Sequence, residues 1–340
     1  YCRIYDTETY ISKEGLARSS AKLIPENSVI VAMYGQGDTA GRVAINKIPI
    51  CTNQACCNLV INHDIADYQY VYYALSNMYD KLVSLKNGGA QPNLNVGVLK
   101  AFEIPFPDLE TQYKISKIIS AYDDLIENNQ KQIKLLEEAA QRLYKKWFVD
   151  LRFPGYENVE IIDGVPKGWI KGILGDIALF KRGKIITKAQ VHEGNVPVVA
   201  GGLDPAYYHN KANTVAPVIT VSGSGANAGF SRLYNVDVFA SDCSFVDSES
   251  TPYLYFVYCF LQENKGILYS MRKGSAQPHV YAKDINALNL NLPTEDTLRA
   301  YCKYVSIYFK KIRTLQRQID ICSQARDCLL PKLMSGEIEV

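Results

Sequence analysis

Hydrophobic side chains follow a coiled-coil spacing over a long stretch of the chain, from Asp108 to Phe148. The apolar positions alternate steps of four and three residues over more than four heptads, with Asn129 filling one slot. They are Ile115, Ile119, Tyr122, Ile126, Ile133, Leu136, Ala140, Leu143 and Trp147. This period is typical of a helix that buries a narrow stripe against a partner. At about 1.5 Å per residue, a helix of ~40 residues is roughly 60 Å long.

The partner of this predicted helix lies in the same chain, because the pattern recurs without a gap 186 residues later. The matching positions are Tyr301, Val305, Tyr308, Ile312, Leu315, Ile319, Cys322, Arg326, Leu329 and Leu333. Both stretches begin with a proline, a good N-cap (Asp108 or Thr294) and acids in the first turn. Two unrelated core helices are the alternative, but a register without gaps over this length favours a duplication.

The segments before the two helices also repeat one another. Each starts with short strand-like runs and turns, continues into a tyrosine-rich stretch of helical spacing, and reaches a glycine-rich segment that ends in Gln-Pro. The helical stretches are Tyr68–Leu85 and Tyr253–Leu268, and the glycine-rich segments are Gly88–Pro92 and Gly274–Pro278. A period this long indicates a domain duplication rather than a solenoid.

The predicted fold is mixed α+β, with two similar globular domains separated by two long antiparallel coiled-coil helices in a pseudo-twofold arrangement. The expected domain limits are 1–107 and 156–293, and the expected helix limits are 108–153 and 294–336. About 24 residues of the second domain, Val165–Lys188, have no counterpart in the first, which therefore looks truncated at its N-terminal side.

Three local expectations follow from single residues. A short strand, Phe102–Phe106, is predicted just before the first long helix. Pro331 is expected to bend or end the second one, because proline lacks the N–H that a helix interior needs. Asn129 at a seam position is expected to fix the register of the pair at some cost in stability.

The composition is that of a globular protein, with 340 residues, 47% hydrophobic and 21% charged. The net charge is only +2, so any nucleic acid would be held by local patches rather than by a global basic field. The nine cysteines form no CxxC pair and no zinc spacing with the four histidines. With no secretory leader and no membrane-spanning run, we expect a reducing, cytoplasmic setting without a membrane partner.

A Gly-x-Gly-x-x-x-Gly pattern occurs twice, at Gly35–Gly41 and Gly223–Gly229. Such a pattern can cradle a phosphate when a helix follows it. The run downstream is strand-like in both copies, so the pattern favours a tight turn between strands. A turn whose backbone approaches DNA closely would use the same freedom.

Signatures of catalysis are weak along the chain. Asp204–Tyr207 is similar to the Asp-Pro-Pro-Tyr tetrad of amino-methyltransferases, but it lacks the second proline and a preceding cofactor-binding segment. The histidines are scattered, at positions 63, 192, 209 and 279. Asp123-Asp124 and Glu137-Glu138 are interpreted as the solvated face of the long helix. We therefore expect no catalytic residue, no cofactor and no metal site.

Basic and amide side chains recur beside the repeated glycines, and these side chain types reach phosphates and base edges. Ordinary surface solvation explains any one of them equally well, but their recurrence favours contact with DNA. The candidates are Gln36, Arg42, Lys86 and Asn87 in the first domain, and Lys181, Arg182, Lys184, Asn227, Arg232, Arg272 and Lys273 in the second.

The order globule, long helix, globule, long helix resembles the specificity subunit of type I restriction–modification systems over essentially the whole chain. Local stretches carry the same resemblance: Gly88–Pro92, Ile104–Pro107 with Leu109 and Gln112, Trp147-Phe148, Phe153–Gly155, Pro166–Trp169, Ala276–Pro278, Leu329-Leu330 with Leu333, and Ser335–Ile338. The shortened first globule, Pro331 and the seam residue Arg326 depart from the pattern.

The resemblance implies a non-catalytic subunit with two target-recognition domains, each of which reads half of a bipartite site in double-stranded DNA. It also implies that the helices act as a ruler and dock two DNA methyltransferase subunits, and that motor-nuclease subunits join for restriction. Two other classes stay open at this point: a coiled-coil scaffold without DNA specificity, and a self-contained DNA methyltransferase.

Overall fold

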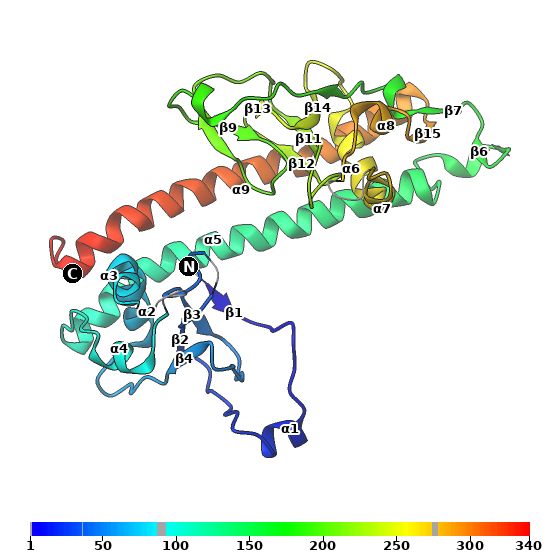
Figure 1. Ribbon diagram of the computed structural model, residues 1–340. Coiled ribbons are helices and arrows are strands. Elements are labelled where there is room, and N and C mark those ends of the chain that lie inside the picture. The colour runs from blue at the N-terminus through cyan, green and yellow to red at the C-terminus, as the bar shows by residue number, and fades with distance from the viewer. Residues whose placement is uncertain (1, 36, 87–92, 274–277) are drawn as a thin grey trace. The chain divides into compact units, whose positions relative to one another are not determined.

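The computed structural model describes residues 2–35, 37–86, 93–273 and 278–340 (Figure 1). The chain divides into two compact units. Unit 1 comprises Tyr1–Gln130 and Arg317–Val340, and unit 2 comprises Lys131–Gln316. Each unit therefore contains one globule together with part of both long helices. Among the described residues, no helix combines the length and the apolar character that crossing a membrane requires.

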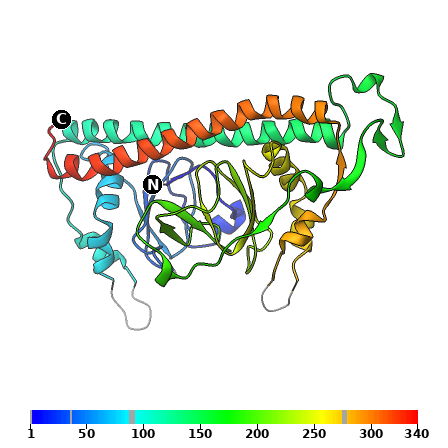
Figure 2. The same cartoon turned by 90° about the horizontal axis from the view of Figure 1, so that it is seen from above.

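Both long helices predicted from the hydrophobic pattern are present. Helix α5 spans Leu109–Tyr144 and continues into a π-helical turn, η1 (Lys145–Val149), while α9 spans Glu295–Ser335. Asp108 caps α5 by accepting the Thr111 N–H at 3.0 Å. In unit 1, Asp123 pairs with Arg326 and Asn129 hydrogen-bonds Gln318, so residue numbers rise along one helix as they fall along the other. The helices are antiparallel, and Figure 2 shows them side by side.

Pro331 lies inside α9 and does not end it, because the helix continues to Ser335. Of the two expected outcomes, a bend or an end, the structure excludes the end of the helix at this proline. Leu330, Leu333 and Met334 are buried in the core of unit 1 and hold the last turn in place. Burial of these side chains outweighs the single backbone hydrogen bond that proline removes.

Unit 1 packs a four-stranded sheet against a pair of short helices. The strand order is β1-β3-β2-β4, with β2 antiparallel to β3 and β4 and with β1 parallel to β3. The strands are β1 Arg3–Ile4, β2 Val29–Ala32, β3 Val43–Asn46 and β4 Cys56–Leu59, and the helices are α1 Lys13–Ala17, α2 Tyr68–Asn77, α3 Tyr79–Ser84 and α4 Val96–Ala101. Helix α2 buries Tyr70, Tyr72 and Tyr73 in a core that also contains Ile115 and Ile119 of α5.

The described residues of unit 2 form four small sheets. Their orders are β12-β11-β14-β8, β10-β9-β13, β15-β7 and β5-β6. The strands are β5 Ile161–Ile162, β6 Val165–Pro166, β7 Ile170–Ile173, β8 Lys181–Arg182, β9 Val196–Val199, β10 Tyr207–His209, β11 Val218–Ser222, β12 Ser231–Tyr234, β13 Phe239–Ala240, β14 Cys243–Asp247 and β15 Asn289–Leu292. The helices are α6 Leu254–Glu263, α7 Lys265–Ser270 and α8 Ala282–Asn286, with 3₁₀ turns η2 Tyr156–Asn158, η3 Leu174–Asp176 and η4 Lys188–Gln190.

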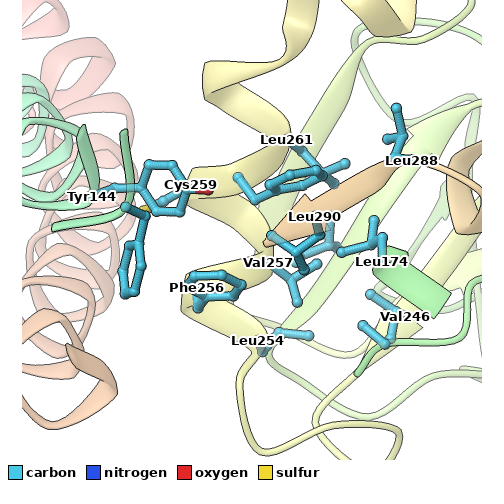
Figure 3. Close-up of a cluster of buried hydrophobic side chains, with 14 of the residues drawn as sticks. Tyr144, Leu174, Val246, Leu254, Phe256, Val257, Cys259, Leu261, Leu288 and Leu290 are labelled. Carbon is cyan, nitrogen blue, oxygen red and sulfur yellow. The ribbon is translucent and has the colours of Figure 1, made fainter. Parts of the chain in front are cut away.

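The core of unit 2 has α6 at its centre. Figure 3 shows Tyr144 of α5 on one side of this helix and Leu174, Val246 and Leu290 on the other. The Tyr144 and Phe256 rings lie 5.5 Å apart, and Tyr301 of α9 joins the same aromatic cluster. Helix α6 therefore joins the long helices to the sheet that carries β11 and β14.

The tyrosine-rich stretch is two helices in each unit rather than one. The break falls at Met78 in unit 1 and at Asn264 in unit 2, which are equivalent positions at the offset of 186. At the second break, the Asn264 side chain donates to the Phe260 carbonyl at 2.9 Å and helps to end α6. The repeat thus extends to the place where each helix stops.

The strand predicted at Phe102–Phe106 does not form, because the described chain offers it no partner strand. Its counterpart in unit 2, β15, pairs along its length with β7. Strand β7 lies within Val165–Lys188, which precedes the part of the second domain that matches the first domain from Tyr1 onward. Pro105 and Pro107 also remove two backbone donors. Strand β15 thus forms beside a partner that the described residues of unit 1 do not contain.

The interpretation of Asp123 as part of a solvated face is also wrong. Its side chain accepts from Arg326 Nη1 at 2.6 Å and from the Tyr73 hydroxyl at 2.7 Å. The exposed fraction is 9% for Asp123, 8% for Arg326 and 1% for Tyr73. Asp124 is exposed, as expected, and pairs with Arg3 of β1. One face of α5 thus carries a buried carboxylate between the globule of unit 1 and helix α9.

Candidate nucleic-acid interface

In both units the described residues of the glycine pattern lie between two antiparallel strands, as predicted. Residues 33–42 connect β2 to β3, and residues 223–230 connect β11 to β12. The last glycine of each pattern has a positive φ, +90° at Gly41 and +85° at Gly229. A Cβ would lie 2.8 Å from the Val83 side chain at Gly41, and 2.9 Å from the Leu268 carbonyl at Gly229. These glycines therefore let each turn pack closely on a short helix, α3 or α7.

An arginine stacks on a tyrosine beside the turn of unit 1. The Arg42 guanidinium lies 4.4 Å from the Tyr79 ring centroid, and its Nε donates to the Asp38 carbonyl at 3.2 Å. The Tyr79 hydroxyl donates to the same carbonyl at 2.8 Å. A hollow of about 140 Å³ lies beside this pair. Stacking orients the guanidinium while leaving N–H groups for other acceptors.

Unit 2 has the same arrangement, built from different sequence positions. The Arg272 guanidinium lies 4.5 Å from the Tyr269 ring centroid at the end of α7. Its Nε donates to the Ala228 carbonyl at 2.8 Å and so ties this helix end to the glycine turn. Each unit therefore presents a stacked arginine where its turn meets the second short helix.

Two further candidates of unit 2 lie near the same turn and pair with carboxylates. Arg182 forms an ion pair with Asp242 at Gly223, and Ser224 Oγ donates to the same carboxylate. Lys273 Nζ lies 2.8 Å from Asp284. Both cations are exposed while their carboxylates are half-buried, and ion pairs that reach solvent contribute only about 0–1 kcal/mol, so the cations can exchange partners with a phosphate. Asn227 lies within the turn and is half-buried.

The remaining candidates lie away from the turns or outside the described residues. Lys181 is exposed on β8, and Lys184 is exposed two residues after that strand. Arg232 lies on β12, at the opposite edge of the sheet, and donates to the Leu203 carbonyl at 2.7 Å. Lys86 is half-buried just after α3. Gln36 and Asn87 lie outside the described residues.

The weak methyltransferase-like signal does not become a site. Asp204 is exposed and lies 3.9 Å from Arg232, and Tyr207 begins strand β10, so the tetrad is a loop that leads into a strand. Burial raises the pKa of Cys243 and of Cys259 to about 12, so both thiols stay protonated near neutral pH. Within the part of the chain that the structure describes, no group of side chains could hold a metal ion.

Sequence reasoning missed one grouping. The rings of His192 and His209 stack 5.9 Å apart, and both line a hollow together with Lys184 and Lys211. The histidines are 17 residues apart, one in a loop and one at the end of β10, and no helix or strand period joins them. Only the pairing of β9 with β10 brings the two segments together.

Comparison with known proteins identifies both repeats. The family model described as the type I restriction modification DNA specificity domain matches residues 1–138 and 166–321. The specificity subunit of the type I restriction enzyme MjaIX of Methanocaldococcus jannaschii is 28% identical over 369 residues, covering 100% of this chain and 84% of the relative. A putative type I specificity subunit of Mycoplasma genitalium, S.MgeORF438P, is 24% identical over 313 residues, covering 89% and 80%.

A solved structure has a similar fold. The crystal structure of the type I restriction–modification S subunit from M. genitalium aligns with a TM-score of 0.57 at 19% sequence identity. The alignment covers 92% of this chain and 84% of that one. At this identity the likeness concerns the fold alone.

Proposed function

Because the chain belongs to the family of type I restriction–modification DNA specificity proteins, we propose that it selects the DNA sequence on which a restriction–modification complex acts. One observation carries the proposal: the family domain occurs twice, once in each unit. In this proposal the domains 1–107 and 156–293 each read one half of a bipartite site in double-stranded DNA. The helices 108–153 and 294–336 set the number of unread base pairs between the halves.

We place the reading surface of each domain at its glycine turn and the adjoining short helix. Arg42 and Arg272 support this position, because each guanidinium is held by a ring and a backbone carbonyl with further N–H groups to spare. A planar guanidinium is the group that recognises guanine most often in the major groove. Arg182, Asn227 and Lys273 surround the turn of unit 2 and would contact phosphates or base edges. The other predicted candidates remain proposals of the same kind.

The proposed partners are DNA methyltransferase subunits, which would dock on the long helices, and motor-nuclease subunits, which would join for restriction. In this proposal the chain itself performs no chemistry and needs no cofactor. The test is direct: purified chain, duplex DNA and radiolabelled S-adenosylmethionine should yield no methylated DNA until a methyltransferase subunit is added. Methyl transfer by the chain alone would establish a self-contained enzyme instead.

A domain exchange tests whether the second globule reads half of the site. Residues 156–293 are replaced by the corresponding segment of a relative with a different target, and methylated positions are mapped in cells that carry the methyltransferase subunit. One half of the recognised motif should change, while the other half and the gap stay the same. A matched control replaces the segment with that of a relative that shares the target. An unchanged motif after the first exchange would favour a scaffold without DNA specificity.

A further inference from the structure

A second polar surface of unit 2 lies apart from the glycine turn. It is a hollow of about 520 Å³ between the segment that follows β8 and the ends of strands β10 and β13. We name it the His209 hollow, after the histidine that lines it. Its polar lining includes Lys184, Lys211 and His209, and Ile185 and Phe239 line it with apolar surface.

The ring of His209 is held in one orientation. The side chain is only 6% exposed, and its Nδ1 lies 3.0 Å from the backbone N–H of His192. A backbone N–H can only donate, so Nδ1 accepts, and the proton of the neutral ring sits on Nε2. The Phe239 ring meets the imidazole edge to face at 5.5 Å and fixes its tilt.

With Nδ1 as the acceptor, the His192 carbonyl at 3.3 Å is not a hydrogen-bond partner of the ring, and no partner of the Nε2–H is found in the described chain. The ring lines the hollow, so an acceptor bound there would satisfy the donor.

The hollow is also positively charged. Lys184 and Lys211 are both exposed at its edge, and no carboxylate is among the residues that line it. Over the described residues, neither ammonium has a salt bridge to a carboxylate. Two cations and a fixed N–H donor together favour an anion with several acceptor oxygens, such as a phosphate.

The apolar wall indicates what the phosphate belongs to. Ile185 is 67% exposed and Phe239 is half-buried, and both face the same space as the cations. A volume of about 520 Å³ leaves room for more than one phosphate group. A sugar–phosphate segment of DNA offers both characters, because its deoxyribose can pack on apolar side chains while its phosphate meets the cations.

We propose that the His209 hollow holds a sugar–phosphate segment of the DNA backbone, with Lys184, Lys211 and His209 Nε2 directed at the phosphate. This inference rests on the proposed function. It adds an anchor that fixes the position of the second domain on the duplex without reading sequence. Lys211, His209 and the apolar wall are thereby assigned to DNA binding together with Lys184.

The test measures DNA binding by the full chain assembled with its methyltransferase subunits. Fluorescence anisotropy is recorded between about 50 and 200 mM salt, with a duplex that carries the target and with one that does not. The variants are Lys184→Ala and Lys211→Ala. Lys171→Ala is the matched control, an exposed lysine of unit 2 on strand β7, outside the hollow.

Each hollow variant should weaken binding to the two duplexes by the same factor and make the slope of log K against log salt shallower by about 1. The control should leave both unchanged. Slopes and affinities equal to those of the control, with normal binding by the unaltered complex, would overturn the backbone anchor and leave the proposed function intact. Failure of the unaltered complex to prefer its target would refute the proposed function instead.

A second arm separates DNA backbone from free phosphate. Inorganic phosphate is titrated into the complex while the Nε2–H resonance of His209 is followed by NMR. A shift of this resonance with target DNA that is lost in the lysine variants supports the proposal. A shift with millimolar phosphate alone, combined with an unchanged salt slope in the lysine variants, would make the hollow a site for a free anion and overturn the anchor.

Discussion

The buried ion pair between Asp123 and Arg326 gives the sharpest prediction about stability. Asp123 accepts from Arg326 Nη1 at 2.6 Å and from the Tyr73 hydroxyl at 2.7 Å, and all three residues are at least nine-tenths buried. Burial alone lowers the pKa of Arg326, but the hydrogen bond and the charge of Asp123 outweigh it and raise the pKa. The arginine therefore stays charged. Removing it leaves the buried Asp123 carboxylate without its cation, and removing Asp123 leaves the arginine paired with the more exposed Asp327.

The size of the effect follows from how buried the pair is. Removing one partner of a buried ion pair costs about 3–5 kcal/mol, whereas replacing both with apolar residues is often neutral. Each side chain is 10% exposed, so we take the lower end, about 3 kcal/mol, for Arg326→Met or Asp123→Leu. The double variant should lose less than about 1 kcal/mol. In unit 2 the equivalent positions are Phe309, Ala140 and Cys259, all buried, so an apolar version already packs in this fold.

Hydrogen exchange measured peptide by peptide is the appropriate assay, because it separates the units. A loss of about 3 kcal/mol corresponds to roughly a hundredfold faster exchange in α2 and β2 of unit 1. The exchange rate of α6 peptides should not change. Tryptophan fluorescence should not detect the loss of stability in unit 1, because Trp147 and Trp169 both lie in unit 2. The reasoning is refuted if the double variant exchanges as fast as the single variants, because the partners would then not be coupled.

Three further predictions concern DNA contact, spacing and thiol chemistry. Arg272→Ala should cost about 1–3 kcal/mol of DNA-binding free energy and relax the preference at one base pair, whereas Lys273→Ala should weaken binding to all sequences alike. Binding to a panel of duplexes with single-base changes distinguishes the two variants. Equal behaviour of the two would count against base reading by Arg272. Deleting seven residues from α5 and seven from α9 removes about 10 Å from each helix and should shorten the gap by about three base pairs, so an unchanged gap would exclude the ruler. At pH 8, iodoacetamide should alkylate the exposed Cys2 and Cys328 but not Cys243 or Cys259, because a pKa of about 12 keeps the two buried thiols neutral. Labelling of Cys243 or Cys259 in the folded protein would contradict their buried placement.

The long helices could be predicted from the sequence because their signal is local and repeated. A period of 3.5 residues is visible within a few turns, and the offset of 186 confirmed it in a second copy. The buried stripe is wider than the predicted seam near each globule. Tyr144 and Phe148 are buried although they are not seam positions, because they pack on α6 as well as on α9.

The errors arise where a residue's state depends on a distant partner. Asp123 looks like a surface acid beside Asp124, and its partner Arg326 is 203 residues away in sequence. Phe102–Phe106 has the composition of a strand, but the described residues contain no neighbour for it equivalent to β7. Local pattern carries no information about either partner, because both come from the way in which the chain folds back on itself.

The candidate site shows the same limit. Sequence reasoning placed basic residues beside the glycine turns, and the structure brings Arg182, Arg272 and Lys273 to one turn. Reasoning from the sequence did not indicate that Arg42 and Arg272 stack on tyrosines in matching places, because these arginines occupy different positions in the two repeats. The two arginines thus lie in similar places on the folded units, although their positions do not correspond in the two sequence repeats.

The central claim is that two similar domains, held on paired helices, read two half-sites at a fixed separation. The most direct measurement is to express the chain with a matching methyltransferase subunit in a host without other DNA methylation and to map every methylated position in the genome. We predict a single bipartite motif with a gap of constant length, which disappears when the chain is omitted. Methylation at a continuous site, at gaps of varying length, or without regard to this chain would contradict the account.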